Sequence, residues 1–115
     1  IKCVPSGHFS EDFGCFFLRQ IASALAYCHR HRVFHCDMKL ENVLYDWKQN
    51  NFRICDFGSA VCLRSEATSS CAVAGSESYM APEIVDATLV NHSLLPAADV
   101  WSLGIMLFVM VIGNL

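Results

Sequence analysis

Apolar residues recur every three or four positions near the start of the chain, and this spacing is typical of one face of an α-helix. Ser10 comes directly before the pattern, and its side-chain oxygen is suited to accept a backbone N–H of the first helical turn. Glu11 and Asp12 follow, where the helix dipole favours negative charge. We therefore predict an amphipathic helix over residues 11–32. Its apolar face contains Phe13, Phe17, Ile21, Ala24, Leu25 and Cys28.

Beyond this helix the pattern changes to short apolar runs separated by polar residues. Residues 33–42 are polar and irregular, which predicts a loop. Residues 43–45 and 52–55 are apolar runs joined by sequence rich in Asn and Asp, which is typical of two strands and a turn. Small polar residues dominate 58–78, and we expect a long loop there, of the kind that is usually functional or disordered.

The C-terminal part is the most apolar, and it carries no charged residue after Asp99. A membrane-spanning helix needs about 20 apolar residues, and Asp99 and Ser102 interrupt this stretch near its start. We therefore predict a buried core helix over 97–112. The side chains that we expect to fill the core include Met106, Phe108 and Met110. Together these elements predict an α+β fold that is mostly helical and contains one short β-hairpin.

The composition narrows the class of protein. Of the 115 residues, 54% are hydrophobic and only 17% are charged, with a net charge of −3. A disordered chain would be poor in apolar residues and rich in charge, so disorder is excluded. Eight Lys and Arg residues spread along an acidic chain form no basic stripe, which argues against nucleic-acid or anionic-membrane partners. A domain of this size needs much polar surface, so the composition is typical of the interior of something larger.

The seven cysteines are an odd number and form no C-x-x-C pair. This usage predicts reduced thiols and an intracellular, cytoplasmic setting rather than a secreted disulfide framework. His29, His31, His35 and Cys36 lie close together in sequence, but the second pair of ligands that a zinc site needs is missing. We expect no metal site built on these four residues.

Three short motifs follow one another: HCDMKLEN at 35–42, DFG at 56–58 and APE at 81–83. A single short motif carries a high false-positive risk, whereas three in this order are specific. On these residues the chain resembles the eukaryotic protein kinase family, serine/threonine type, in the central part of its large C-terminal lobe. The resemblance covers residues 10–115. It implies a partial protein-kinase-like fold in which the hairpin carries the catalytic and metal-binding loops.

The resemblance implies roles in phosphoryl transfer for four residues. Asp37 matches the catalytic Asp that accepts the proton of the substrate hydroxyl, and Lys39 places a positive charge beside the transferred phosphoryl group of ATP. Asn42 and Asp56 match the residues that bind Mg²⁺, an ion that prefers oxygen ligands. We expect the hairpin between Asn42 and Asp56 to hold these two ligands in register. The implied cofactors are ATP and Mg²⁺.

The segment after the hairpin bears on the substrate. Lys39, together with GSESYM at 75–80, is typical of serine/threonine kinases, so the resemblance implies protein substrates with Ser or Thr acceptors. Ser76 replaces the commoner Thr but keeps a hydroxyl that can link Asp37 and Lys39. The stretch 99–114 is similar to the calcium/calmodulin-dependent and AMP-regulated branch. The matched positions of the activation segment and substrate site are Ser76, Tyr79 and Glu83.

Cys36 departs from the family pattern, because an Arg usually precedes the catalytic Asp. In the family that Arg pairs with a phosphorylated residue of the activation segment, a charge-assisted contact that a Cys cannot make. We therefore expect that phosphorylation of this segment does not activate the protein through this contact. The candidate acceptors are Ser65, Thr68, Ser69 and Ser70.

Residues 1–115 are interpreted as a partial kinase domain, from before the catalytic-loop helix to the central buried helix, without the small lobe and the last helices. The sequence contains no glycine-rich loop and no V-A-I-K-type Lys, so we expect these residues alone to be inactive and poorly stable. Without the Arg that pairs with it in the family, Glu83 is expected to be a buried, unpaired carboxylate, which is costly.

Two other classes of function remain as alternatives. One is a pseudokinase-type binding or scaffolding module without phosphoryl transfer, which is disfavoured because the four matched residues are intact. These are Asp37, Lys39, Asn42 and Asp56. The other is a small membrane-associated protein, which the motifs disfavour. The substrate sequence, the activating signal and the oligomeric state stay open at this stage.

Overall fold

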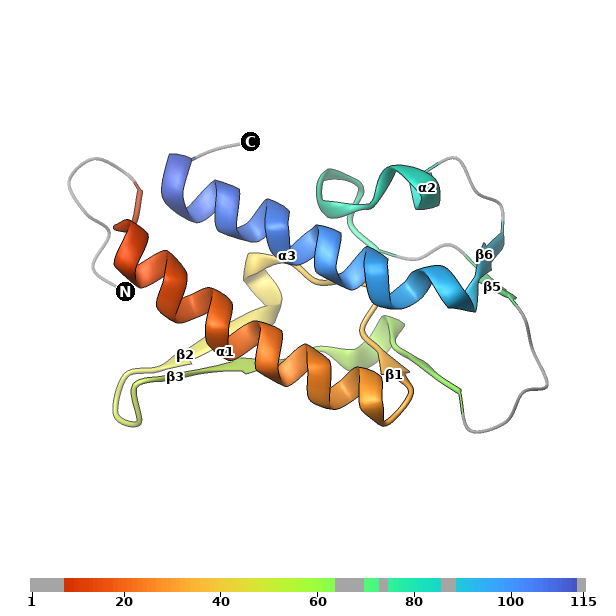
Figure 1. Cartoon of the computed structure of the whole chain (residues 1–115), viewed down its shortest axis with the longest axis horizontal. Coiled ribbons are helices and arrows are strands. Elements are labelled where there is room, and N and C mark those ends of the chain that lie inside the picture. The colour runs from red at the N-terminus through yellow and green to blue at the C-terminus, as the bar shows by residue number, and fades with distance from the viewer. Residues whose placement is uncertain (1–7, 64–69, 73–74, 86–88, 114–115) are drawn as a thin grey trace.

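Two long helices lie side by side and a β-hairpin packs beside the first of them (Figure 1). The computed structural model describes residues 8–63, 70–72, 75–85 and 89–113. The helices are α1, Glu11–Arg30, and α3, Leu95–Ile112. The predicted α+β class is confirmed.

Helix α1 begins where the sequence predicts and ends earlier. The Ser10 hydroxyl accepts the backbone N–H of Phe13 at 3.3 Å, which satisfies one unpaired donor of the first turn. His31 forms the C-cap, and Arg32 follows with a φ of 57°. A positive φ cannot continue a right-handed helix, so the helix stops at Arg30 instead of extending to residue 32.

The predicted hairpin is confirmed, with bounds shifted by one residue. Strand β2, Val43–Asp46, pairs antiparallel with β3, Asn51–Ile54, and Val43 lies opposite Ile54. The backbone N–H of Cys55 donates to the carbonyl of Asn42 at 2.9 Å, which continues the ladder past the end of β2.

The two expected loops contain short strands, so the loop prediction was wrong at these places. Strand β1, Val33–Phe34, pairs with β4, Val61–Cys62, and β5, Ser70–Ala72, pairs with β6, Leu89–Asn91. Strands of two or three residues are too short to show a periodic pattern in the sequence. Each of them forms because it pairs with a segment distant in the chain, which local patterns do not reveal. Single 3₁₀ turns and a short helix α2 complete the described elements. Their bounds are Leu40–Asn42, Phe57–Ser59, Glu77–Tyr79, His92–Leu94 and, for α2, Pro82–Val85.

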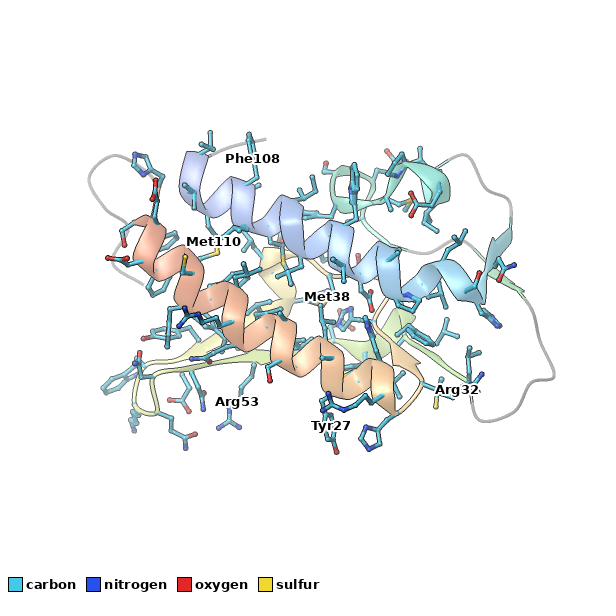
Figure 2. The ribbon with its side chains drawn as sticks, viewed as in Figure 1. Tyr27, Arg32, Met38, Arg53, Phe108 and Met110 are labelled. Atoms are coloured by element: carbon cyan, nitrogen blue, oxygen red, sulfur yellow. The ribbon has the colours of Figure 1, made fainter. Side chains whose placement is uncertain are left out.

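The main core lies between α1 and α3 and also receives Met38 from the loop after β1. Its buried members are Phe17, Ile21, Leu25, Met38, Leu103, Met106 and Met110. Gly14 allows the two helices to approach closely, because a Cβ there would lie 3.1 Å from side-chain atoms of Leu107 and Val111. The core prediction for Met106 and Met110 is confirmed. Phe108 is 51% exposed and lies on the side of α3 that faces away from α1 (Figure 2), so its predicted burial was wrong.

Helix α3 is long and apolar enough, with its preceding turn, to cross a membrane by length and composition alone. One side of the helix nevertheless packs against α1, and the same side carries the buried carboxylate of Asp99. The predicted burial therefore holds for this side of the helix only, because the other side is exposed at Val100, Trp101, Phe108 and Ile112.

Candidate active site

The loop between β1 and β2 carries three of the candidate residues, and its backbone is held by one carboxylate of α3. Asp99 is 1% exposed. Its Oδ2 accepts the backbone N–H of His35 at 3.0 Å, and its Oδ1 accepts that of Cys36 at 2.9 Å. Because buried backbone donors must be paired, these bonds fix the two residues that precede Asp37.

Asp99 has a third partner in α1. The Nε2 of His29 donates to Asp99 Oδ2 at 2.8 Å. The same carboxylate therefore joins both long helices to the loop.

Burial, followed by the nearby charge of Asp99, raises the pKa of the Cys28 thiol and keeps it protonated at neutral pH.

His35 supports the loop from inside and is fully buried. Its Nε2 donates to the carbonyl of Cys55 at 3.0 Å, while its Nδ1 accepts the backbone N–H of Asp37 at 3.3 Å. Its ring also contacts Phe57, with ring centroids 4.8 Å apart. These contacts link the loop of Asp37 to the segment of Asp56, so His35 has a structural role in this loop.

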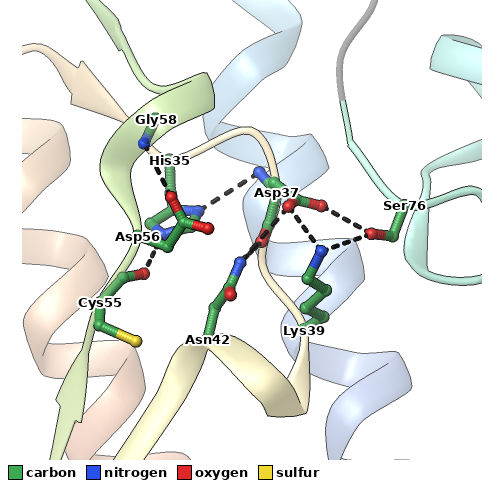
Figure 3. A network of polar contacts seen from close by, with 8 residues as sticks. All are labelled: His35, Asp37, Lys39, Asn42, Cys55, Asp56, Gly58 and Ser76. Carbon is green, nitrogen blue, oxygen red and sulfur yellow. Dashed lines mark hydrogen bonds and ion pairs between the residues drawn. The ribbon is translucent and has the colours of Figure 1, made fainter.

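Asp37, Lys39 and Ser76 form a closed network of three polar side chains (Figure 3). Lys39 Nζ lies 2.8 Å from Asp37 Oδ2 and donates to Ser76 Oγ at 2.9 Å. The Ser76 hydroxyl in turn donates to Asp37 Oδ1 at 2.9 Å. The structure thus brings together three residues that were proposed from the sequence, and Ser76 makes the expected link.

The charges in this network act on one another. Burial alone would raise the pKa of the Asp37 carboxyl, but hydrogen bonds from Lys39 and Ser76 and the charge of Lys39 outweigh burial and lower it. The hydrogen bond to Asp37 raises the pKa of Lys39. At neutral pH the pair is therefore ionised. An ionised carboxylate can accept a hydrogen bond from a hydroxyl group and take up its proton in a transition state.

Asn42 and Asp56 lie on adjacent ends of the hairpin, as the sequence predicts. The Asn42 side-chain N–H donates to the Asp37 carbonyl at 2.8 Å, which ties the amide to the loop of Asp37. Asp56 has a φ of 58°, and its Oδ1 accepts the backbone N–H of Gly58 at 3.2 Å. The left-handed conformation is unusual for a residue with a Cβ.

Tyr79 and Glu83 belong to the part of the 75–85 segment that follows Ser76. The Tyr79 carbonyl accepts the Ser102 hydroxyl of α3 at 2.7 Å, and its ring packs against the main core. Burial, followed by the charge of Glu41, raises the pKa of Tyr79. Glu83 is exposed, so the expectation of a buried, unpaired carboxylate was wrong. Its position in the first turn of the short α2 turns the side chain toward solvent.

Sequence reasoning missed the role of Asp99 and its partner His29. The signal was present, because Asp99 is the one acidic residue at the start of a helix that is otherwise apolar. A buried carboxylate is retained only where donors surround it. Which donors these are depends on the fold, since His35 lies 64 residues away in sequence.

Comparison of the sequence with known proteins identifies related chains. Residues 2–115 match the family model for the protein kinase domain. The serine/threonine-protein kinase SRK2F of Arabidopsis thaliana is 39% identical over 111 residues, which are 94% of this chain and 30% of that protein. The SNF1-like protein kinase ssp2 of Schizosaccharomyces pombe is 40% identical over 114 residues, which are 97% of this chain and 19% of that protein. The carbon catabolite-derepressing protein kinase of Candida tropicalis is also 40% identical over 114 residues, with shares of 97% and 17%. The chain spans less than a third of the length of these relatives.

Proposed function

Because this chain belongs to the protein kinase family, serine/threonine type, we propose that it supplies the catalytic loop of an active kinase. In the proposed reaction the γ-phosphoryl group of ATP is transferred to a Ser or Thr hydroxyl of a protein substrate. The observation that carries this proposal is the network of Asp37, Lys39 and Ser76, because it places a carboxylate and a cation at one point.

Each member of the network has a distinct task. Asp37 accepts a hydrogen bond from the attacking hydroxyl and takes up its proton as the new O–P bond forms, while the bond between the γ-phosphorus and the bridging oxygen breaks and ADP leaves. Lys39 sets its positive charge beside the charge that develops on the phosphoryl oxygens. Ser76 holds the other two in place, since it bonds to both.

The residues beside this network fit Mg²⁺. Asn42 and Asp56 offer an amide oxygen and a carboxylate oxygen, and Mg²⁺ takes a few such ligands and completes its shell with water and phosphate. When bound, the ion would neutralise phosphate charge. The chain's own contribution is to fix the two ligands relative to Asp37, through the Asn42 bond to its carbonyl and the bond from Cys55 to Asn42.

The proposal also extends to the branch of the kinase family and to the cellular location. The SNF1-like relative supports the AMP-regulated part of the branch named above. We keep an intracellular, cytoplasmic location as part of the proposal, supported by Cys15, Cys28 and Cys62, which are free thiols in the described part of the chain. Fractionation of cells that express the full-length protein tests this location, and recovery from the medium would contradict it.

The direct test of the reaction uses the full-length protein, ATP labelled at the γ-phosphate, Mg²⁺ and a mixed-sequence protein substrate. We expect label on Ser and Thr, identified by phosphoamino-acid analysis. Label on Tyr alone would overturn the assigned acceptor. Nucleotide binding without any transfer would overturn the reaction and favour the pseudokinase-type alternative.

A further inference from the structure

Gly75 occupies a position that a residue with a side chain cannot enter without movement. Its φ is 120°, a conformation that L residues rarely adopt. A Cβ built on Gly75 would lie 2.7 Å from the carbonyl oxygen of Cys36, closer than real Cβ atoms come to any heavy atom. The Cys36 carbonyl therefore occupies the space that a side chain at position 75 would need.

The Cys36 side of this contact cannot retreat easily. The Cys36 N–H donates to Asp99 Oδ1 at 2.9 Å, and that carboxylate is buried in α3. Cys36 also has a φ of 65°, so its backbone is already confined to a small region. A side chain at position 75 would consequently displace the segment of Gly75 and leave the loop in place.

The displaced segment carries Ser76. To reach an ordinary separation of 3.4 Å from the Cys36 carbonyl, a Cβ at position 75 must move by about 0.7 Å. The Ser76 bonds to Asp37 and Lys39 are 2.9 Å long. An equal displacement of the hydroxyl would stretch them to the distance at which a hydrogen bond is lost. The segment cannot swing freely to compensate, because Ser102 holds its other end at the Tyr79 carbonyl.

We propose that Gly75 is a positioning residue, which sets the Ser76 hydroxyl against Asp37 and Lys39 because the Cys36 carbonyl occupies the space that a side chain at position 75 would need. This inference rests on the proposed function and adds a requirement to it. Alignment of the two halves of the site depends on the absence of a side chain at position 75.

The test is a double-mutant cycle in the full-length protein, with Gly75→Ala, Ser76→Ala and the double variant. Gly75→Ala is expected to lower kcat for protein phosphorylation at least about tenfold and to leave the KM for ATP within about twofold. If Gly75 acts through Ser76, the double variant has the kcat of Ser76→Ala within about twofold. Gly104→Ala is the matched control, because a Cβ there meets nothing within 4 Å, and its kcat is expected to equal that of the wild type.

Two results would overturn the inference. One is a double variant whose loss equals the product of the two single losses, which would show that Gly75 acts elsewhere. The other is an unchanged kcat in Gly75→Ala.

The same cycle measured by urea unfolding separates this inference from the proposed function. If no variant and no wild-type sample transfers phosphate, the proposed function is wrong. The unfolding cycle then still decides the role of Gly75, since non-additive losses support the contact with the Ser76 network and additive losses refute it.

Discussion

The hydroxyl of Ser76 lies 2.9 Å from the Asp37 carboxylate, although 39 residues separate them in the sequence. This bond joins the loop that follows β1 to the segment that follows β5. Lys39 bonds to both partners, so the three side chains constrain one another. The position of the Asp37 carboxylate therefore depends on the segment of Ser76.

The first prediction concerns this hydroxyl. A hydrogen bond to a charged group is worth about 1.5–3 kcal/mol, and about 1.4 kcal/mol corresponds to a tenfold change in rate. Ser76→Ala should therefore lower kcat about 10- to 100-fold, as measured by phosphate transfer to protein. Ser76→Thr keeps the hydroxyl and should retain most of the activity. Ser78→Ala, at an exposed position, is the control, and an equal loss there would show that the effect does not come from the network.

The second prediction concerns Asp99. Asp99→Asn replaces one acceptor oxygen by an N–H₂ group and leaves at least one buried donor without a partner, at a cost of about 1–3 kcal/mol for each such donor. We expect the free energy of unfolding to fall by about 3 kcal/mol or more, because Asp99 bonds to His29, His35 and Cys36. Chemical denaturation measures the change. A loss below about 0.5 kcal/mol, the size typical of exposed surface sites, would contradict the role of Asp99 as the anchor of the loop.

The third prediction concerns pH. The pKa of Asp37 is lowered in the folded protein, so its contribution to stability is present above about pH 4 and is lost as the pH falls through the folded pKa. The pKa of Lys39 is raised, so its contribution is present below about pH 10 and is lost as the pH rises through the folded pKa. The stability difference between wild type and Lys39→Met should therefore be constant from about pH 5 to 9 and shrink below about pH 4.

Lys48→Met is the control for this pH series, because Lys48 contacts the exposed ring of Trp47 and no carboxylate of the network. Its difference from the wild type should show no such decrease in acid. A Lys39→Met difference that grows below about pH 4 would have the wrong sign for a salt bridge with a carboxylate.

The fourth prediction follows from Cys36. Residues 64–69 lie outside the described structure, and three of the four candidate phosphate acceptors belong to this range. Acidic replacements at these four positions should change kcat by less than about twofold relative to Ala replacements, because Cys36 cannot form a charge-assisted pair. The set is Ser65, Thr68, Ser69 and Ser70. A gain of about tenfold or more in the acidic variants would show that another cation performs the role of the missing Arg.

The helical elements could be predicted because their cause is local. The Ser10 cap and the apolar face of α1 are visible in the sequence and agree with the structure. In α3 almost every position is apolar, so periodicity cannot decide which side faces the core. For that reason Met106 was placed correctly and Phe108 was not.

The candidate site could be predicted only through resemblance to a family. Nothing in the spacing of Asp37 and Ser76 shows that they meet, and the same holds for Asp99 and His35. The sequence also does not reveal the role of Gly75, because the group that excludes a side chain there is a backbone carbonyl distant in the chain. Long-range contacts of this kind are products of the fold, and local patterns do not contain them.

The most direct test of the account is the kcat of Asp37→Asn in the full-length protein, measured with labelled ATP and a protein substrate. The amide keeps the shape of the side chain but cannot take up a proton, and a general base contributes about 10²- to 10⁴-fold to rate. We predict a loss of about 1,000-fold with the fold intact, while Asp12→Asn, at an exposed site on α1, retains wild-type activity. Equal activity of Asp37→Asn and the wild type would contradict the assignment of Asp37 as the catalytic carboxylate.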